Sequence, residues 1–304
     1  MNSIEINNIS KSFGSKKALQ TINLNVEAGE VFGLIGADGA GKSTLFDILV
    51  TLSKSDSGTA RIEGLDVEKD YKKIRKIVGY MPGRFSLYMD LTVYENLDFF
   101  ASIFGGTIED NYELIKDIWV QIEPFKDRPA GKLSGGMKQK LALCCALVHQ
   151  PRVLFLDEPT TGVDPVSRNE FWNMLKNLKR KGITILVSTP YMDEAILCER
   201  IALMQEGKIM AIDTPSNITK AFNKPLFSVK STHQRKLINT LRRFDQAYSC
   251  YFFGQSVHLA AKNESVSAKE ISDYLNENGH PEIQVAKISA GIEDCFIELM
   301  RKTA

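Results

Sequence analysis

Hydrophobic and polar positions alternate along the first 212 residues in the manner of a layered α/β structure. Short apolar runs rich in β-branched residues recur at 31–35, 77–81, 153–156 and 183–188, and helical patterns follow three of them. Runs of this length beside turn signals are typical of buried strands. The pattern predicts that these four segments are strands of one sheet.

The region of about 84–135 has a different, mainly helical pattern. The stretches TVYENLDFFASIF and NYELIKDIWVQI carry apolar residues three to four positions apart, which is the spacing of one face of a helix. We expect this region to be a helical insert in the sheet domain.

The chain starts a new pattern after residue 220. The spacing of apolar residues there predicts a strand at 226–231, a helix at 233–244, two hairpin strands around Gly254, a helix at 267–276, a strand at 283–288 and a helix at 292–302. We therefore expect two domains, 1–220 and 221–304, the second a small α+β domain with ferredoxin-like order.

A glycine-rich loop, GADGAGKS, follows the first apolar run and precedes the helical stretch STLFDILVTL. It fits the phosphate-loop pattern GxxxxGK[ST], in which glycines let backbone N–H groups point inwards and the next helix adds about half a positive charge. Lys42 would reach phosphate oxygens and Ser43 would bind magnesium. The loop alone leaves transporters, GTPases, kinases and helicases open. Its phosphate-binding residues are Gly36, Ala37, Asp38, Gly39, Ala40, Gly41, Lys42, Ser43 and Thr44.

Two acidic residues, Asp157 and Glu158, follow the apolar run VLFL. The end of such a strand lies at the carboxyl edge of the sheet, where open α/β folds bind ligands. A carboxylate there can hold magnesium, for which Asp157 is the candidate, and a second can act on the attacking water, for which Glu158 is the candidate.

The segment LSGGMKQ begins a further predicted helix with Ser134 as its N-cap. Because LSGGM lies about 20 residues before VLFLDE, residues 1–215 resemble the ATP-binding cassette (ABC) ATPases. The resemblance implies a P-loop NTPase cassette with a mixed sheet core and a helical subdomain, using ATP and Mg²⁺. It also implies head-to-tail pairing with a second cassette, in a homo- or heterodimer, so that Ser134, Gly135 and Gly136 serve the partner's ATP.

The same resemblance assigns two further elements. Phe13 matches the aromatic residue that stacks on adenine. The segment TTGVDP, which includes Asp164, matches the loop that touches the opposite cassette.

Two positions depart from the family pattern. Gly83 stands where ABC ATPases have a Gln that helps the magnesium shell, and Pro190 stands where they have a switch His that contacts the γ-phosphate. Pro190 suits the first position of a helix capped by Thr189. Loss of both side chains predicts a site that binds ATP and turns it over slowly.

Several segments, among them FSLYMDLTVYENL and AGIEDCFIELM, are similar to cassettes of type 2 ABC exporters for drugs and other amphipathic compounds. The chain resembles the amino-terminal, degenerate half of a pair of unlike cassettes. We expect it to dock on polytopic permease subunits through residues 84–96, with Phe85, Leu87, Tyr88, Leu91 and Val93 lining the docking groove. A regulatory ATP-binding subunit and a soluble non-transport ABC ATPase remain the alternatives.

Composition and charge limit the classes of partner and the cellular location that we expect for this protein. The 38 basic and 37 acidic residues create no strong field, so nucleic acid is not an expected partner. No apolar stretch approaches the roughly 20 residues of a membrane span, and the first residues lack a secretory signal. We expect a cytoplasmic protein that is peripheral on the inner face of the cell membrane.

Overall fold

The computed structural model describes residues 1–303 and divides the chain into two compact units, Met1–Pro215 and the residues from Ser216 onward. The division lies at the start of helix α7 (Pro215–Lys220), and the predicted boundary at residue 220 lies at its end. Each unit has a sheet and a hydrophobic core of its own.

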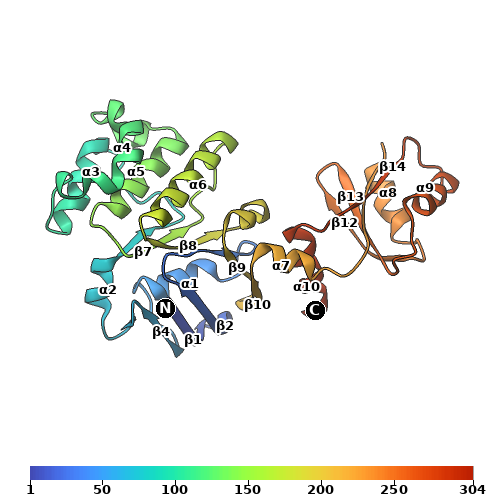
Figure 1. Ribbon diagram of the computed structural model, residues 1–304, viewed down its shortest axis with the longest axis horizontal. Helices are drawn as coiled ribbons and strands as arrows, with labels where there is room; N and C mark the ends of the chain where they lie inside the picture. Colours follow the sequence, from blue (N-terminus) through green and yellow to red (C-terminus); the bar gives the residue numbers. More distant parts are fainter. Residues whose placement is uncertain (304) are drawn as a thin grey trace. The chain divides into compact units, whose positions relative to one another are not determined.

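The first unit is built on a six-stranded sheet of order β10-β9-β3-β8-β7-β6 (Figure 1). Neighbouring strands run parallel except for the β9–β10 hairpin. Every residue of β3, β7 and β8 is buried, as continuous apolar runs in a parallel sheet require. All four predicted strands are confirmed. The strands are β3 (Val31–Ile35), β6 (Val78–Met81), β7 (Val153–Asp157), β8 (Thr184–Thr189), β9 (Arg200–Gln205) and β10 (Lys208–Asp213).

A second, antiparallel sheet has the order β2-β1-β4-β5. Its inward residues share one hydrophobic cluster with helix α1 and the central sheet. The strands are β1 (Asn2–Phe13), β2 (Lys16–Glu27), β4 (Ser57–Ile62) and β5 (Leu65–Asp66).

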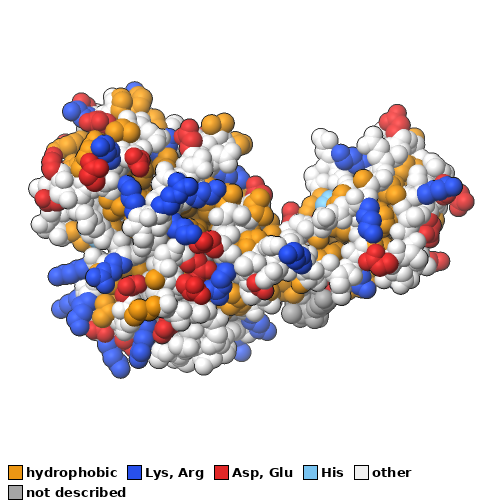
Figure 2. Space-filling model, in the orientation of Figure 1, with side chains coloured by type: hydrophobic (Ala, Val, Ile, Leu, Met, Phe, Trp, Pro, Cys, Tyr) orange, Lys and Arg blue, Asp and Glu red, His pale blue; other side chains and the backbone are white. Residues whose placement is uncertain are grey.

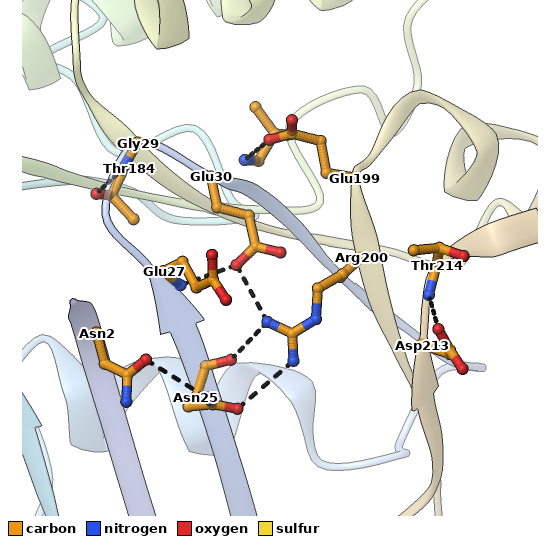
Figure 3. A network of polar contacts seen from close by, with 11 residues as sticks. Asn2, Asn25, Glu27, Gly29, Glu30, Thr184, Glu199, Arg200, Asp213 and Thr214 are labelled. Atoms are coloured by element: carbon orange, nitrogen blue, oxygen red, sulfur yellow. Dashed lines mark hydrogen bonds and ion pairs between the residues drawn. The ribbon is translucent and has the colours of Figure 1, made fainter. Parts of the chain in front are cut away.

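A polar network joins the two sheets at the end of β3 away from the phosphate loop (Figure 3). Arg200 on β9 lies 3.3 Å from the carboxylate of Glu30 and 3.5 Å from the backbone oxygen of Asn25 on β2. Burial raises the pKa of Glu30, although the backbone N–H of Glu27 and the charge of Arg200 oppose that shift. Glu199 accepts a hydrogen bond from the N–H of Val31. These contacts fix the entry to β3 and thereby the strand that carries the phosphate loop.

Helices α3, α4 and α5 gather at one end of this unit, away from the antiparallel sheet (Figure 1). Helix α5 contacts both α3 and α4. Helix α3 begins with a capping box, in which the side chain of Thr92 accepts a hydrogen bond from the N–H of Glu95 and the side chain of Glu95 accepts one from the N–H of Thr92. This group contains the expected helical insert. The helices of the unit are α1 (Lys42–Leu49), α2 (Tyr71–Ile77), α3 (Val93–Ile103), α4 (Tyr112–Ile122), α5 (Gly135–Leu147), α6 (Pro165–Arg180) and the 3₁₀ helices η1 (Glu109–Asn111), η2 (Glu123–Phe125), η3 (Ala130–Lys132) and η4 (Met192–Leu197).

The second unit contains an antiparallel sheet of order β12-β13-β11-β14 with the element order βαββαβ. This is the order of a ferredoxin-like α+β domain. Apolar side chains of α8 and α9 share a cluster with the strands. Its elements are β11 (Leu226–Lys230), α8 (Gln234–Leu241), β12 (Ala247–Phe253), β13 (Ser256–Ala261), α9 (Ala268–Glu277), β14 (Gln284–Ile288) and α10 (Ile292–Thr303).

Candidate nucleotide site

The glycine-rich loop connects β3 to α1, as predicted, and packs closely on neighbouring backbone. A β-carbon on Gly36 would lie 2.3 Å from the carbonyl oxygen of Met204. Gly41 has φ +104°, and a β-carbon there would lie 2.5 Å from the carbonyl oxygen of Ala18. Both positions therefore require glycine. Gly41 is also the N-cap of α1 and offers no capping side chain, which suits a helix end that receives an anion.

Lys42 is the first residue of α1, and only 3% of its surface is exposed. Its ammonium group donates to the carbonyl oxygens of Gly36 at 2.9 Å and Ala37 at 3.1 Å. It also lies 3.0 Å from Oε1 of Glu158. The lysine of the phosphate loop and the acid after β7 thus meet, although 116 positions separate them.

The end of β7 is held by Ser188 of the neighbouring strand β8. The Ser188 hydroxyl donates to Oδ1 of Asp157 at 2.5 Å and accepts from the N–H of Glu158 at 3.0 Å. Glu158 has φ +50°, a conformation that costs a non-glycine residue about 1–3 kcal/mol and that often marks functional sites. Ser188 follows the apolar run Ile-Leu-Val of β8, and its role at the site was not evident from the sequence.

Negative charge gathers around Asp157. Burial raises the pKa of Asp47 on α1, and the charge of Asp157 adds to that shift. Burial likewise raises the pKa of Tyr80, with further contributions from Asp157 and Asp47. A cation near Asp157 would relieve this repulsion.

A cavity of about 230 Å³ brings most of the predicted phosphate-loop residues together. Phe13, with 55% of its surface exposed, lies in the wall, and Lys16 is a lining residue that the sequence analysis missed. Three predicted residues, Gly36, Ala37 and Ala40, lie outside the lining. The carbonyl groups of Gly36 and Ala37 accept hydrogen bonds from Lys42 instead. The lining residues are Phe13, Lys16, Ala18, Asp38, Gly39, Gly41, Lys42, Ser43, Thr44 and Glu158.

The LSGGM segment begins α5 as predicted and lies outside that cavity. Ser134 is the N-cap and accepts a hydrogen bond from the N–H of Met137. Gly136 packs against α6, since a β-carbon there would lie 2.8 Å from Oγ of Ser167. Ser134, Gly135 and Gly136 therefore do not contribute to this chain's own cavity.

Gly83 and Pro190 lie beside the acidic end of the site. A β-carbon on Gly83 would lie 3.2 Å from the backbone oxygen of Asp157. Pro190 directly follows β8, and the expectation that it begins a helix capped by Thr189 is wrong. The helix is a 3₁₀ helix that begins at Met192, and the Thr189 hydroxyl accepts from the N–H of Tyr191 at 3.0 Å.

Comparisons with known proteins agree with this geometry. Residues 19–161 match the family described as ABC transporter. The chain is 40% identical over 303 residues to a probable multidrug ABC transporter ATP-binding protein of Escherichia coli K12, covering 98% of this chain and 52% of that protein. It is also 40% identical to a Nod factor export ATP-binding protein of Burkholderia lata, covering 70% of this chain and 71% of that protein. The chain thus spans about half the length of the first of these relatives.

Solved structures give the same fold. A cbiO1 protein from Clostridium perfringens, part of an ABC transporter complex, aligns with a TM-score of 0.65 and 26% identity, covering 80% of this chain and 96% of that one. A dimeric ATP-binding cassette in a post-hydrolysis state, bound to ADP and Pi, aligns with a TM-score of 0.63 and 26% identity, covering 69% of this chain and 98% of that one.

Proposed function

Since the chain belongs to the ABC transporter family of ATP-binding proteins, whose cassettes bind and hydrolyse ATP, we propose that it is the ATPase subunit of a membrane exporter. The meeting of Lys42, the phosphate loop and Glu158 in one cavity carries this proposal. Phe13 in the cavity wall offers a face on which adenine stacks. Lys42 and the N-terminus of α1 take up the phosphates. Glu158 is the carboxylate that acts on the attacking water.

Magnesium fits the same site. The Ser43 hydroxyl and the Asp157 carboxylate offer hard oxygen ligands, and Asp47 on α1 is a second carboxylate close enough for its charge to interact with that of Asp157. When bound, the ion neutralises charge on the phosphate oxygens. Ser188 keeps Asp157 oriented through its hydroxyl.

The chain acts as the degenerate member of an asymmetric, head-to-tail pair of cassettes. Its own site lacks the side chains of a Gln at Gly83 and a His at Pro190, which lowers hydrolysis there. The LSGGM segment keeps the family pattern and lies outside that site. Its residues Ser134, Gly135 and Gly136 can therefore complete the site of the partner. The same two departures support the alternative of a regulatory ATP-binding subunit.

An apolar groove of about 430 Å³ is the candidate docking site for permease subunits. Of the five residues predicted to line it, only Leu87 does so, while Val93 is fully buried and Tyr88 packs on Phe99. Its lining includes residues of α3 and α5 and the exposed Leu52. Basic side chains gather over neighbouring α2 (Figure 2), and Arg75 of that helix lines the groove.

Attachment to the inner face of the membrane follows from this docking. Among residues 1–303, no helix combines the length and the apolar character needed to cross a bilayer. Contact with the permease is then the route to the membrane. The second unit supports the cassette dimer or regulates it, and both roles stay open.

Calorimetry with magnesium-ATP tests the central claim. Lys42→Ala removes a charged hydrogen bond to phosphate and should cost about 1.5–3 kcal/mol of binding free energy, or roughly 10- to 150-fold in affinity. Lys287→Ala is the matched control, since Lys287 is an exposed lysine of β14 in the second unit. Equal ATP affinity in wild type and Lys42→Ala would refute nucleotide binding at this loop.

A further inference from the structure

Glu194 is a buried carboxylate that the nucleotide site does not use. It lies on η4, and only 1% of its surface is exposed. Its Oε1 accepts a hydrogen bond of 2.7 Å from Thr160, and its Oε2 accepts one of 2.6 Å from Thr189. Nε of Arg168 lies 3.5 Å from Oε1.

These contacts join three segments that surround the acidic end of the site. Thr160 begins the TTGVDP segment, which follows Glu158 closely in the chain. Thr189 is the last residue of β8 and directly precedes Pro190. Arg168 lies on α6. Thr160 and Thr189 are 1% and 0% exposed. Since a buried carboxylate without partners costs several kcal/mol, Glu194 and its partners stay together only while the three segments keep this arrangement.

Arg168 strengthens the link in a second way. Its guanidinium lies 4.2 Å from the ring centroid of Tyr191, so it also packs on the loop after Pro190. Its NH1 lies 3.5 Å from Oδ2 of Asp193, a side chain with 74% of its surface exposed. The buried contact to Glu194 and the exposed contact to Asp193 can therefore be tested separately.

Pro190 makes the loop after β8 depend on these contacts. Proline has no side-chain or backbone N–H at the position of the switch His, so the loop has no donor of its own there. The loop is instead tied through Thr189 and Glu194 to Thr160.

On the premise of the head-to-tail pairing proposed above, we propose that Glu194 is a positioning residue that ties the TTGVDP segment to the loop containing Pro190. The geometry of the surface presented to a second cassette thus depends on a carboxylate that lies outside the lining of the nucleotide cavity. Glu194 acts on the partner's site through Thr160 and leaves magnesium-ATP binding at Lys42 unaffected.

Amide hydrogen exchange in the full chain tests the positioning without a partner. The N–H of Val163, bonded to the Thr160 carbonyl, and that of Tyr191, bonded to the Thr189 hydroxyl, report on the two loops. Glu194→Ala should accelerate exchange at both about tenfold or more, which corresponds to about 1.4 kcal/mol. Glu194→Gln, which keeps one acceptor oxygen, should recover part of the protection, and Asp193→Asn should change neither amide.

Three outcomes of this experiment would overturn the positioning role. They are unchanged exchange in Glu194→Ala, faster exchange that extends equally to the buried strand β7, and an equal effect of Asp193→Asn. Thr160→Val removes one donor with little change of shape, and it provides the same test if Glu194→Ala does not fold. Its expected result is faster exchange at Val163 with a smaller effect at Tyr191.

Measurements on the assembled pair separate this role from the pairing itself. Glu194→Ala should lower hydrolysis by the pair about tenfold while the affinity of the isolated chain for magnesium-ATP stays within about twofold. If the wild-type chain does not associate with a second cassette in ATP, the pairing is wrong, and exchange alone then decides whether Glu194 positions the loops. If the wild type associates and hydrolysis by Glu194→Ala is normal, the pairing stands and the role of Glu194 in it is refuted.

Discussion

Gly83 lies directly against Asp157, so that a β-carbon on Gly83 would lie 3.2 Å from the backbone oxygen of Asp157 and 3.7 Å from its Oδ2. The residue at position 83 therefore decides whether a side chain reaches the proposed magnesium ligand. Contact at 3.2 Å is close, and a larger residue requires a small displacement of the loop. Such a shift is feasible because residues 82–86 form an irregular connection after β6.

Restoring the two missing side chains should raise hydrolysis at this chain's own site. Gly83→Gln combined with Pro190→His returns two polar groups, each of a kind that contributes roughly tenfold or more to turnover in other enzymes. Phosphate release by the reconstituted pair, in which the second cassette completes this chain's own site, measures the effect. Adding Glu158→Gln should abolish the gain, and Gly83→Ala shows whether the β-carbon alone is tolerated. Turnover no faster than wild type would show that these departures do not limit the site.

Hydrolysis by the assembled pair should depend more on Ser134 than on Glu158. Ser134→Arg places a large side chain in the segment proposed to complete the partner's site and should remove most turnover, about 100-fold or more. Glu158→Gln disables only this chain's own site and should leave most turnover in place. Steady-state phosphate release by the reconstituted pair compares the two. Equal loss in both variants would mean that this chain's own site is catalytic.

Membrane recovery should depend on the apolar groove. Ile103→Asp places a carboxylate at a groove residue whose surface is 58% exposed, and burying that charge in a permease contact should weaken binding about tenfold or more. Val120→Asp is the control, because Val120 is 48% exposed on α4 and lies outside the groove. Membrane fractions from cells with and without the permease measure the recovery. Membrane binding that survives loss of the permease would refute docking through the groove.

His149, which also lines the groove, should make stability pH-dependent. It stacks on Phe104 at 3.8 Å, and its Nε2 lies 2.9 Å from the carbonyl oxygen of Val78. Burial lowers the pKa of His149 below its ordinary 6.5. The unfolded chain therefore binds this proton first, and stability present above about pH 6.5 is lost as the pH falls towards the folded-state pKa.

Replacing His149 by Gln removes this titration while leaving an amide that can donate to Val78. The free energy of unfolding from urea titrations should then fall less steeply below pH 6.5 than in wild type. His280, whose pKa burial also lowers, is present in both proteins and cancels in the comparison. The same slope in both proteins would show that His149 does not cause the pH dependence.

The sequence by itself determined the features that depend on short stretches of chain. The apolar runs of β3, β7 and β8 predict buried strands because the spacing of apolar residues and their branching at the β-carbon act within a few residues of the chain. The phosphate loop is equally local, since glycines that permit the turn and a helix that follows it are adjacent in the chain. The order of elements in the second unit follows from the same kind of pattern.

Only the tertiary structure decided which distant residues meet. The order of the strands and the contact of Lys42 with Glu158 depend on pairing across long separations. Ser188 supports Asp157 because β8 lies next to β7 in register, which no local pattern encodes. Glu194 is an ordinary acidic residue in the sequence, and it becomes the link between two loops because the fold buries its carboxylate against Thr160, Thr189 and Arg168.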